Sequence, residues 1–526
     1  MNTEIKYPVG IQNFSKIREY GFLYVDKTAS MFPIIKQGGY YFLSRPRRFG
    51  KSLLLSTLEA FYKGRHDLFK GLAIDSLTDD WTPHPVLHLD LNYGSYRSPQ
   101  DLDEILDDHL RIWESEFGQV NSESEDKVVS PSIRFNRIIR NAFEKTGRKV
   151  VILVDEYDKP LLNTIHDPEL SDLYRSQLKA FYSNLKTMDP YIELAILTGV
   201  ARFSKVSIFS DLNNLNDISF DKRFAAICGI TADELDEYFS EGIRNMAEEM
   251  ALSPLEVREL LRKRYDGYHF SEVSPDIYNP FSLVNAFSKN AMDDYWFASG
   301  TPSYLVSLIR NGRIQPREIA PITIDREKLI TAGLLNANPI PAFYQSGYLT
   351  IKGFDMEFNE FILDYPNEEV KRGFLDFLLD SYFPQIENRR GFSIPDFVRD
   401  VRAGKPEAFM KRMESLIAAI PYNGKGSAED HFQNAVYLLF NLMGFYAKME
   451  DRTSDGRIDL QVESHDCIFI FEFKIDSSAR VAMDQILEKR YWLRENAGNR
   501  RIFLIGANFD TKTRRLTETL IEKVKD

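Results

Sequence analysis

The sequence predicts an α/β protein in three successive parts: a parallel sheet flanked by helices, a mostly helical middle region, and a smaller α/β domain. Over the first 225 residues, short apolar runs alternate with helical patterns, which is typical of α/β construction. The pattern becomes mostly helical from about residue 231, and clear strands return after residue 456. We therefore expect domains over 1–230, 231–387 and 388–526, with the core of the last one at about 428–510.

Composition places the chain among ordinary globular proteins. It is 43% hydrophobic and 27% charged, which is sufficient to bury real cores. No apolar run approaches the roughly 18 residues of a membrane-spanning helix, and residues 1–10 lack a secretion pattern. Cys228 and Cys467 stand far apart, without the spacing of a disulfide framework or a structural zinc site. We expect a cytoplasmic protein with no membrane partner.

The formal net charge of −12 argues against a protein that coats nucleic acid through its overall field. A locally basic groove around an acidic metal site is still compatible with this charge.

The elements that carry the candidate sites can be placed from local patterns. In the N-terminal part we expect strands over 40–44, 86–91, 150–155 and 195–198, and a helix over 51–62. After a linker-like segment at 421–426, we expect a helix (428–443), two strands (457–462 and 467–474), a helix (478–493) and a strand (501–507).

A Gly-Lys-Ser sequence at residues 50–52 follows the first expected strand and opens the helix after it. Backbone N–H groups at a helix N-terminus bind phosphate. Lys51 can reach the β- and γ-phosphates of a nucleotide, and Ser52 can ligate Mg²⁺. The usual phosphate-loop pattern has glycine at position 45, where this chain has Arg45, so a basic turn before a helix is the alternative interpretation.

The expected strand 150–155 ends in two carboxylates. Asp155 is placed to bind Mg²⁺ through its water shell, and Glu156 to orient or deprotonate an attacking water. A strand followed by an acidic turn is common by itself. The phosphate loop and the acidic strand end, occurring in this order, favour the binding of ATP or GTP.

The next expected strand ends in Thr198, and Arg202 follows shortly after it. Thr198 can sense the γ-phosphate, and Arg202 can neutralise charge in the transition state. A surface arginine or a salt-bridge partner is an equally good interpretation of Arg202.

A second cluster of charged residues lies near the C-terminal end. Glu472 and Lys474 point to one face of their strand because strand side chains alternate. If the hairpin is centred on residues 465–466 without a bulge, Asp459 lies opposite Glu472, with Cβ atoms about 4.5–5.5 Å apart. Such a pair can hold Mg²⁺ for phosphodiester hydrolysis, and Lys474 can orient the water or stabilise the transition state.

The alternative is a solvent-facing hairpin that carries a Glu–Lys pair. The apolar run at 467–471 argues against it, because a charged pair at the end of a buried strand needs a reason.

Several segments of the chain resemble the AAA-ATPase-like family. They are Arg45-Pro-Arg-Arg-Phe-Gly-Lys-Ser-Leu, Asp155-Glu-Tyr-Asp, Ser207-Ile-Phe-Ser-Asp-Leu-Asn-Asn-Leu, Tyr265-Asp-Gly-Tyr-His-Phe, Tyr278-Asn-Pro-Phe-Ser, Gly347-Tyr-Leu-Thr-Ile and Pro366-Asn-Glu-Glu-Val. The loop of that family also carries arginine where the first glycine is expected, so Arg45 agrees with the resemblance. The resemblance implies nucleotide binding and leaves the rate of hydrolysis open. The candidate nucleotide-binding residues are Arg45, Arg48, Phe49, Gly50, Lys51, Ser52, Asp155, Thr198 and Arg202.

In that family the ATPase-like region commonly precedes a PD-(D/E)xK nuclease domain, and the last domain here is similar to that superfamily in its order of elements. The resemblance implies site roles for Glu429, at the start of the preceding helix, and for Gln485, on the following helix with Tyr491 after it. Ile458 stands where the family has proline. An ordinary helix-surface residue is the alternative for both Glu429 and Gln485.

Together these features predict an ATP-binding, ATP-regulated nuclease that uses Mg²⁺, or Mn²⁺ in its place, and acts on nucleic acid, with DNA favoured over RNA. Its catalytic candidates are Glu156 in the first site and Asp459, Glu472, Lys474, Glu429 and Gln485 in the second. A homo-oligomer is compatible with the sequence. The alternative is a signalling or scaffolding NTPase switch whose nuclease-like domain only binds nucleic acid or a protein partner.

Overall fold

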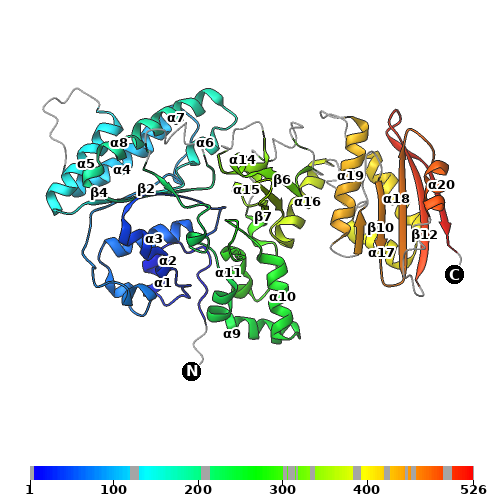
Figure 1. Cartoon of the computed structure of the whole chain (residues 1–526), viewed down its shortest axis with the longest axis horizontal. Coiled ribbons are helices and arrows are strands. Elements are labelled where there is room, and N and C mark those ends of the chain that lie inside the picture. Colours follow the sequence, from blue (N-terminus) through cyan, green and yellow to red (C-terminus); the bar gives the residue numbers. More distant parts are fainter. Residues whose placement is uncertain are drawn as a thin grey trace. The chain divides into compact units, whose positions relative to one another are not determined.

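The computed structural model describes most of the chain (Figure 1). The described residues are 5–118, 129–202, 212, 214–299, 305, 314, 318–331, 338–382, 393–419, 427–444, 448–451, 458–489 and 500–524, excluding the side chains of 380–382, 448–451, 458–459 and 489. The expected linker at 421–426, most of the segment 207–215, Tyr491 and the side chain of Asp459 therefore lie outside the described part. The chain divides into two compact units, Met1–Leu305 with Ala320–Lys371, and Val306–Ile319 with Arg372–Asp526. The expected division into three domains stays a prediction.

The first unit contains a five-stranded parallel sheet with the order β2-β3-β4-β1-β5. Its strands are β1 (Gly39–Ser44), β2 (Val86–Asp90), β3 (Val150–Asp155), β4 (Ile192–Gly199) and β5 (Asn216–Asp217). The first four match the predicted strands. Because β4 pairs with both β1 and β3, the carboxyl ends of these three strands lie side by side, where open α/β sheets bind ligands.

Helices cover both faces of this sheet, with α1 to α3 on one side and α4, α5 and α7 on the other (Figure 1). Their bounds are α1 (Phe14–Glu19), α2 (Thr28–Gln37), α3 (Lys51–Tyr62), α4 (Asp101–Phe117), α5 (Pro131–Thr146), α6 (Lys159–Asn163), α7 (Pro168–Tyr182) and α8 (Asn184–Thr187). In α5 the buried residues Phe135, Ile138, Ile139 and Ala142 recur at helical spacing, so a single stripe faces the core.

The middle region is mostly helical, as predicted, and adds one small sheet. Its elements are α9 (Ala232–Met250), α10 (Pro254–Tyr265), α11 (Pro280–Lys289), α12 (Tyr295–Ala298), β6 (Ile322–Asp325), α14 (Arg326–Thr331), α15 (Ile340–Gln345), β7 (Thr350–Asp355), β8 (Glu360–Asp364) and α16 (Glu368–Tyr382). Thr231 and Ser253 begin α9 and α10 with capping boxes. The antiparallel sheet, in the order β6-β8-β7, was not predicted, because strands of four to six residues interspersed with charges give little periodic signal.

The second unit contains a mixed five-stranded sheet with the order β13-β12-β11-β10-β9. Its elements are α17 (Ile394–Ala403), α18 (Pro406–Ala418), α19 (Ala428–Met443), β9 (Lys448–Asp451), β10 (Ile458–Glu463), β11 (Cys467–Ile475), α20 (Ala479–Lys489), β12 (Arg501–Asp510) and β13 (Arg515–Lys523). The predicted order of helix, two strands, helix and strand is confirmed in α19, β10, β11, α20 and β12.

Alternation along β11 separates two layers of side chains. Phe469, Phe471 and Phe473 stack toward aromatic side chains of α18 and α19. Ile468 and Ile470 pack on the other face in a cluster with residues of α20. Glu472 and Lys474 belong to the α20 face, because they alternate with the phenylalanines.

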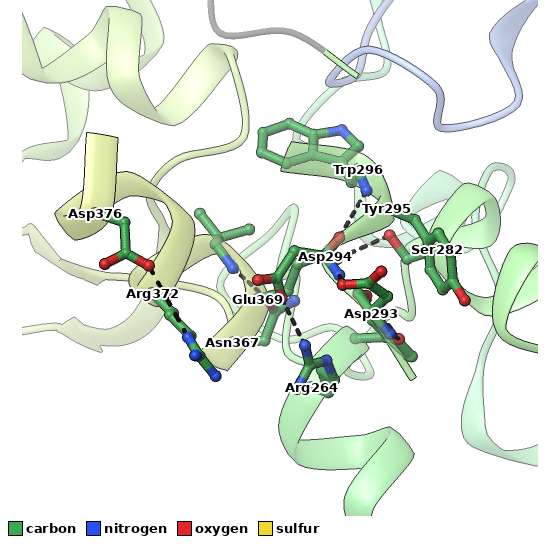
Figure 2. A network of polar contacts seen from close by, with 12 residues as sticks. Arg264, Ser282, Asp293, Asp294, Tyr295, Trp296, Asn367, Glu369, Arg372 and Asp376 are labelled. Carbon is green, nitrogen blue, oxygen red and sulfur yellow. Dashed lines mark hydrogen bonds and ion pairs between the residues drawn. The ribbon is translucent and has the colours of Figure 1, made fainter. Parts of the chain in front are cut away.

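A buried carboxylate, Glu369, organises the contacts at the start of α16 (Figure 2). Its two oxygens accept hydrogen bonds from Ser282 Oγ at 2.8 Å and from the backbone N–H of Trp296 at 2.6 Å. The indole Nε1 of Trp296 donates to the carbonyl of Arg47 at 3.0 Å, and Arg47 lies in the loop between β1 and α3. Burial raises the pKa of Glu369 to about 7, from an ordinary value of 4.5.

Among the described residues of both units, no helix is long and apolar enough to span a bilayer.

The raised pKa of Glu369 predicts a specific pH dependence of stability. Between about pH 4.5 and about pH 7 the unfolded chain loses this proton while the folded chain retains it, so the free energy of unfolding falls as pH rises. We expect the melting temperature of the wild type to fall relative to that of Glu369→Gln across this window. Glu368→Gln, at an exposed neighbouring position, is the control and should leave the wild-type pH dependence unchanged. A constant difference between wild type and Glu369→Gln would contradict this assignment.

Candidate functional site

A pocket of about 520 Å³ lies at the carboxyl ends of the parallel strands in the first unit. The predicted loop residues Gly50, Lys51 and Ser52 line it, and Glu156 joins them from the end of β3. The middle region contributes Phe281, Asn285, Trp296 and Tyr348, and the N-terminal segment 8–12 completes the wall. Parts of the chain that are distant in sequence therefore line one cavity.

The N-terminus of α3 opens into this pocket. Gly50 precedes the helix with φ 95°, a left-handed conformation that is strained for any other residue. The structure shows no side-chain cap on this end of α3 among its described residues, so N–H groups of the first turn remain available to a ligand. With the helix dipole, they form a site for an anion such as phosphate.

Lys51 lies along the loop beneath this opening. Its ammonium donates to the carbonyls of Arg45 at 3.0 Å and Pro46 at 2.9 Å, and only 4% of the residue is exposed. These two hydrogen bonds hold the Lys51 side chain against the loop, beside the pocket that it lines.

Two residues predicted for nucleotide contact face away from this pocket. Arg45 is fully buried, and its guanidinium donates to the carbonyls of Ser44, Ser219 and Phe224 at 2.8–3.1 Å. Phe49 is also fully buried, with its ring edge-on to two aromatic rings of the middle region. Both side chains pack on the side of the loop away from the pocket. Their placement therefore does not support a direct contact with the nucleotide.

Arg48 does line the pocket, with its guanidinium 4.1 Å from the centre of the Phe281 ring. This cation–π contact joins the loop to α11.

The acidic strand end divides into a buried and an accessible carboxylate. Asp155 is 5% exposed and accepts hydrogen bonds from Thr198 Oγ1 at 2.8 Å and from the N–H of Glu156 at 3.1 Å. Thr198 is fully buried, and neither Asp155 nor Thr198 is among the residues that line the pocket. Glu156 lines it, and its backbone is left-handed with φ 49°. Strain of this kind in a non-glycine residue is common at functional sites.

Arg202 lies away from the pocket. Its guanidinium pairs with Asp217 and sits 4.9 Å from the centre of the Phe220 ring, while its backbone N–H donates to Gln345. The salt-bridge interpretation therefore describes Arg202 in this structure, and a role at the γ-phosphate stays a prediction.

The sequence did not single out three residues near Glu156. Asn92 and Lys159 line the pocket, and Asp158 is buried behind it. The carboxylate of Asp158 accepts hydrogen bonds from the backbone N–H groups of Val200 and Ala201 at 2.9 and 2.5 Å. Burial raises the pKa of Asp158 to about 6. The carboxylate leaves no space for a side chain at Gly199, where a Cβ would be 2.6 Å from Asp158 Oδ1. The signals available were the proximity of Asp158 and Lys159 to Glu156 in the sequence and the presence of Asp158 in the Asp155-Glu-Tyr-Asp segment.

The second candidate site lies on the α20 face of the C-terminal sheet. The predicted register is confirmed, because Asp459 pairs directly with Glu472 across β10 and β11. Glu472 is fully buried, and Lys474 Nζ donates to Glu472 Oε1 at 2.8 Å and to Gln485 Oε1 at 2.6 Å. The structure thus brings Gln485 of α20 to the charged pair.

Glu429 lies in the first turn of α19, where its carboxylate accepts a hydrogen bond from Gln433 at 3.0 Å. Its participation in the site stays a prediction.

The donors on β10 and β11 fit a hard divalent cation. Carboxylate oxygens are the ligands that Mg²⁺ prefers, and the pairing register puts two such residues opposite each other. Among the described side chains, no three His, Cys, Asp or Glu residues gather around a common point; the Asp459 side chain lies outside that set.

Comparisons with known proteins cover nearly all of the chain. A family described as "Predicted AAA-ATPase" matches residues 8–209, and the PD-(D/E)XK nuclease superfamily matches residues 427–519. An "Uncharacterized protein in vnfD 5'region" of Azotobacter chroococcum mcd 1 is 34% identical over 531 residues, which span 99% of each chain. No solved structure matches. The chain belongs to the predicted AAA-ATPase family, and it carries a PD-(D/E)XK nuclease superfamily domain at its C-terminal end.

Proposed function

We propose that the protein is an ATP-regulated, Mg²⁺-dependent nuclease, in which ATP binds in the N-terminal pocket and phosphodiester bonds of DNA are hydrolysed at the C-terminal site. The observation that carries the proposal is the N-terminus of α3, where Lys51 and Ser52 open into a cavity of about 520 Å³ that also contains Glu156. A free helix N-terminus, a lysine and a carboxylate in one cavity are the groups that nucleotide hydrolysis requires.

In the first site, the N–H groups of α3 and the ammonium of Lys51 would hold the phosphates. Ser52 would hold Mg²⁺ directly and Asp155 would hold it through its water shell; when bound, the ion would neutralise phosphate charge. Glu156, accessible from the pocket, would orient the attacking water and accept its proton.

In the second site, Asp459 and Glu472 would hold Mg²⁺, which when bound polarises the phosphodiester and acidifies its water. Lys474 is fixed between Glu472 and Gln485, so its ammonium is oriented before any substrate arrives. Such an oriented cation can stabilise the charge that develops on the phosphate in the transition state.

Regulation would begin at Trp296. This residue lines the pocket, and its indole donates a hydrogen bond to the Arg47 carbonyl. Its backbone N–H donates a hydrogen bond to the carboxylate of Glu369, at the start of α16 (Figure 2). A nucleotide that changes the loop would therefore change contacts at the first turn of α16. The chain continues through α16 into the residues of the second unit.

One observation favours a second candidate, a nucleotide switch with slow turnover whose nuclease-like domain only binds a nucleic acid or protein partner. Arg202, a candidate for neutralising transition-state charge, is paired with Asp217 and is not among the residues that line the pocket. An arginine supplied to a γ-phosphate can raise hydrolysis rates by roughly 10³–10⁵, so its displacement favours slow turnover.

Lys51→Ala should weaken ATP binding by about tenfold to a hundredfold, because it removes a charge-assisted contact with the phosphates. Isothermal titration with ATP measures this effect, and Lys63→Ala, which removes an exposed lysine at the other end of α3, is the control. If ATP regulates cleavage, the response of nucleic-acid cleavage to ATP should disappear in Lys51→Ala. Cleavage that is identical in wild type and Lys51→Ala under all nucleotide conditions would contradict the regulation.

Arg202→Ala should destabilise the protein by about 3–5 kcal/mol, because it leaves Asp217 as an unpaired, mostly buried charge. ATP affinity of the folded variant should stay close to that of the wild type. Thermal unfolding and ATP titration of the same preparation test both expectations. An unchanged melting temperature together with a large loss of ATPase activity would instead support a role for Arg202 at the nucleotide site.

Glu472→Ala and Lys474→Met should each abolish cleavage, because they remove a metal ligand and the oriented cation. The assay uses plasmid, linear duplex and single-stranded DNA and RNA, with Mg²⁺ or Mn²⁺, and with or without ATP. Glu488→Ala, at an exposed position of α20, is the matched control and should cleave like the wild type. Wild-type protein without cleavage under every condition would support the nucleotide-switch alternative.

A further inference from the structure

Lys159 has a different environment from the other pocket cations. Among the described pocket-lining residues, the cations are Arg47, Arg48, Lys51 and Lys159. The ammonium of Lys51 donates hydrogen bonds to two carbonyls of the loop, and the guanidinium of Arg48 lies on the ring of Phe281. Lys159 Nζ instead lies 3.6 Å from the carboxylate of Glu156 and donates to Asn92 Oδ1 at 3.0 Å.

Helix stability does not explain a lysine at this position. Lys159 is the first residue of α6, and the N-terminal end of a helix favours negative rather than positive charge. Its ammonium contacts two side chains that line the pocket, one from the end of β3 and one from the segment after β2.

The backbone around Lys159 is fixed on several sides. Its N–H donates to the Glu156 carbonyl at 2.9 Å, and the N–H of Tyr157 donates to the Thr198 carbonyl at 3.0 Å. Asp158 adds two hydrogen bonds to backbone N–H groups that follow β4. Glu156 and Lys159 therefore project from one turn that is anchored to the neighbouring strand.

Asn92 is also held before any ligand binds. Its backbone N–H donates to Asp90 Oδ1 at 2.8 Å, which closes a turn directly after β2. This turn brings the amide oxygen of Asn92, an exposed residue, to the Lys159 ammonium.

We propose that Lys159 is a positioning residue for Glu156: anchored by Asn92, its ammonium holds the Glu156 carboxylate where it meets the water that attacks the γ-phosphate. This inference rests on the proposed ATP hydrolysis. In that reaction the water oxygen forms a bond to the γ-phosphorus, the bond from that phosphorus to the ADP oxygen breaks, and one water proton passes to Glu156. Lys159 keeps its proton throughout and acts through the position of the carboxylate.

Lys159→Met should lower the kcat of ATP hydrolysis by about tenfold to a hundredfold, as displacement of a catalytic group does, while KM and the Kd for ATP change by less than about twofold. Lys159→Arg retains the charge and should recover most of the lost kcat. Asn92→Ala should show the same selective effect on kcat, to a smaller extent. Lys186→Met, which removes an exposed lysine of α8, is the matched control.

A double variant separates positioning from a direct contact with phosphate. Because Lys159 acts through Glu156, adding Lys159→Met to Glu156→Gln should cause no further loss of kcat. Additive losses, a rise in KM or Kd at constant kcat, or an unchanged kcat in the folded Lys159→Met variant would each overturn the proposal.

The outcomes for the wild type distinguish this inference from the proposed function. Wild-type protein that binds ATP without hydrolysing it would overturn the role of Lys159 and leave the nucleotide-binding proposal standing. Wild-type protein that does not bind ATP would overturn the proposed function itself. If Lys159→Met does not fold, Asn92→Ala carries the same test.

Discussion

The N-terminal site depends on the buried guanidinium of Arg45. Burial of a charge is costly unless polar groups compensate it, and here the two terminal nitrogens donate to three backbone carbonyls while the guanidinium lies on the face of Phe270. These contacts tie the loop to the segment 219–224 and to the middle region. The arginine therefore fixes the loop through tertiary contacts, at the position where other phosphate loops have a glycine.

Other contacts from the middle region reinforce the same loop. Phe49 packs between the rings of Tyr268 and Phe270, and Trp296 holds the Arg47 carbonyl. Glu369 then holds Trp296, so a carboxylate more than three hundred residues after the loop contributes to its position. Three segments of the family resemblance, 45–53, 265–270 and 366–370, thus contribute to one layer behind the pocket. This layer explains why residues 231–305 and 320–371 form one compact unit with the parallel sheet.

The two candidate sites use charge in a related way. In each, a lysine lies within 4 Å of a carboxylate and is held by a side-chain amide, Asn92 for Lys159 and Gln485 for Lys474. The amide oxygen accepts a hydrogen bond from the ammonium, which reduces the freedom of the lysine side chain. A lysine has many rotamers, so this anchoring lowers the entropy that must be lost when a substrate is bound.

The sequence by itself determined the local structure. Apolar runs located β1 to β4 and β10 to β12, the Gly-Lys-Ser turn located the start of α3, and the hairpin centre determined that Asp459 pairs with Glu472. These features follow from short-range rules of periodicity and turn geometry, which a single sequence displays.

The tertiary structure decided which side chains reach the sites. It placed Arg45 and Phe49 behind the loop, paired Arg202 with Asp217, brought Asn92 to Lys159, and formed the sheet of β6, β7 and β8. Most of these contacts join residues far apart in the chain, and even the Arg202 pair depends on how β4 and β5 flank β1. The direction of a side chain within its element is local, but the partner it meets is set by the packing of distant elements, which periodicity does not encode.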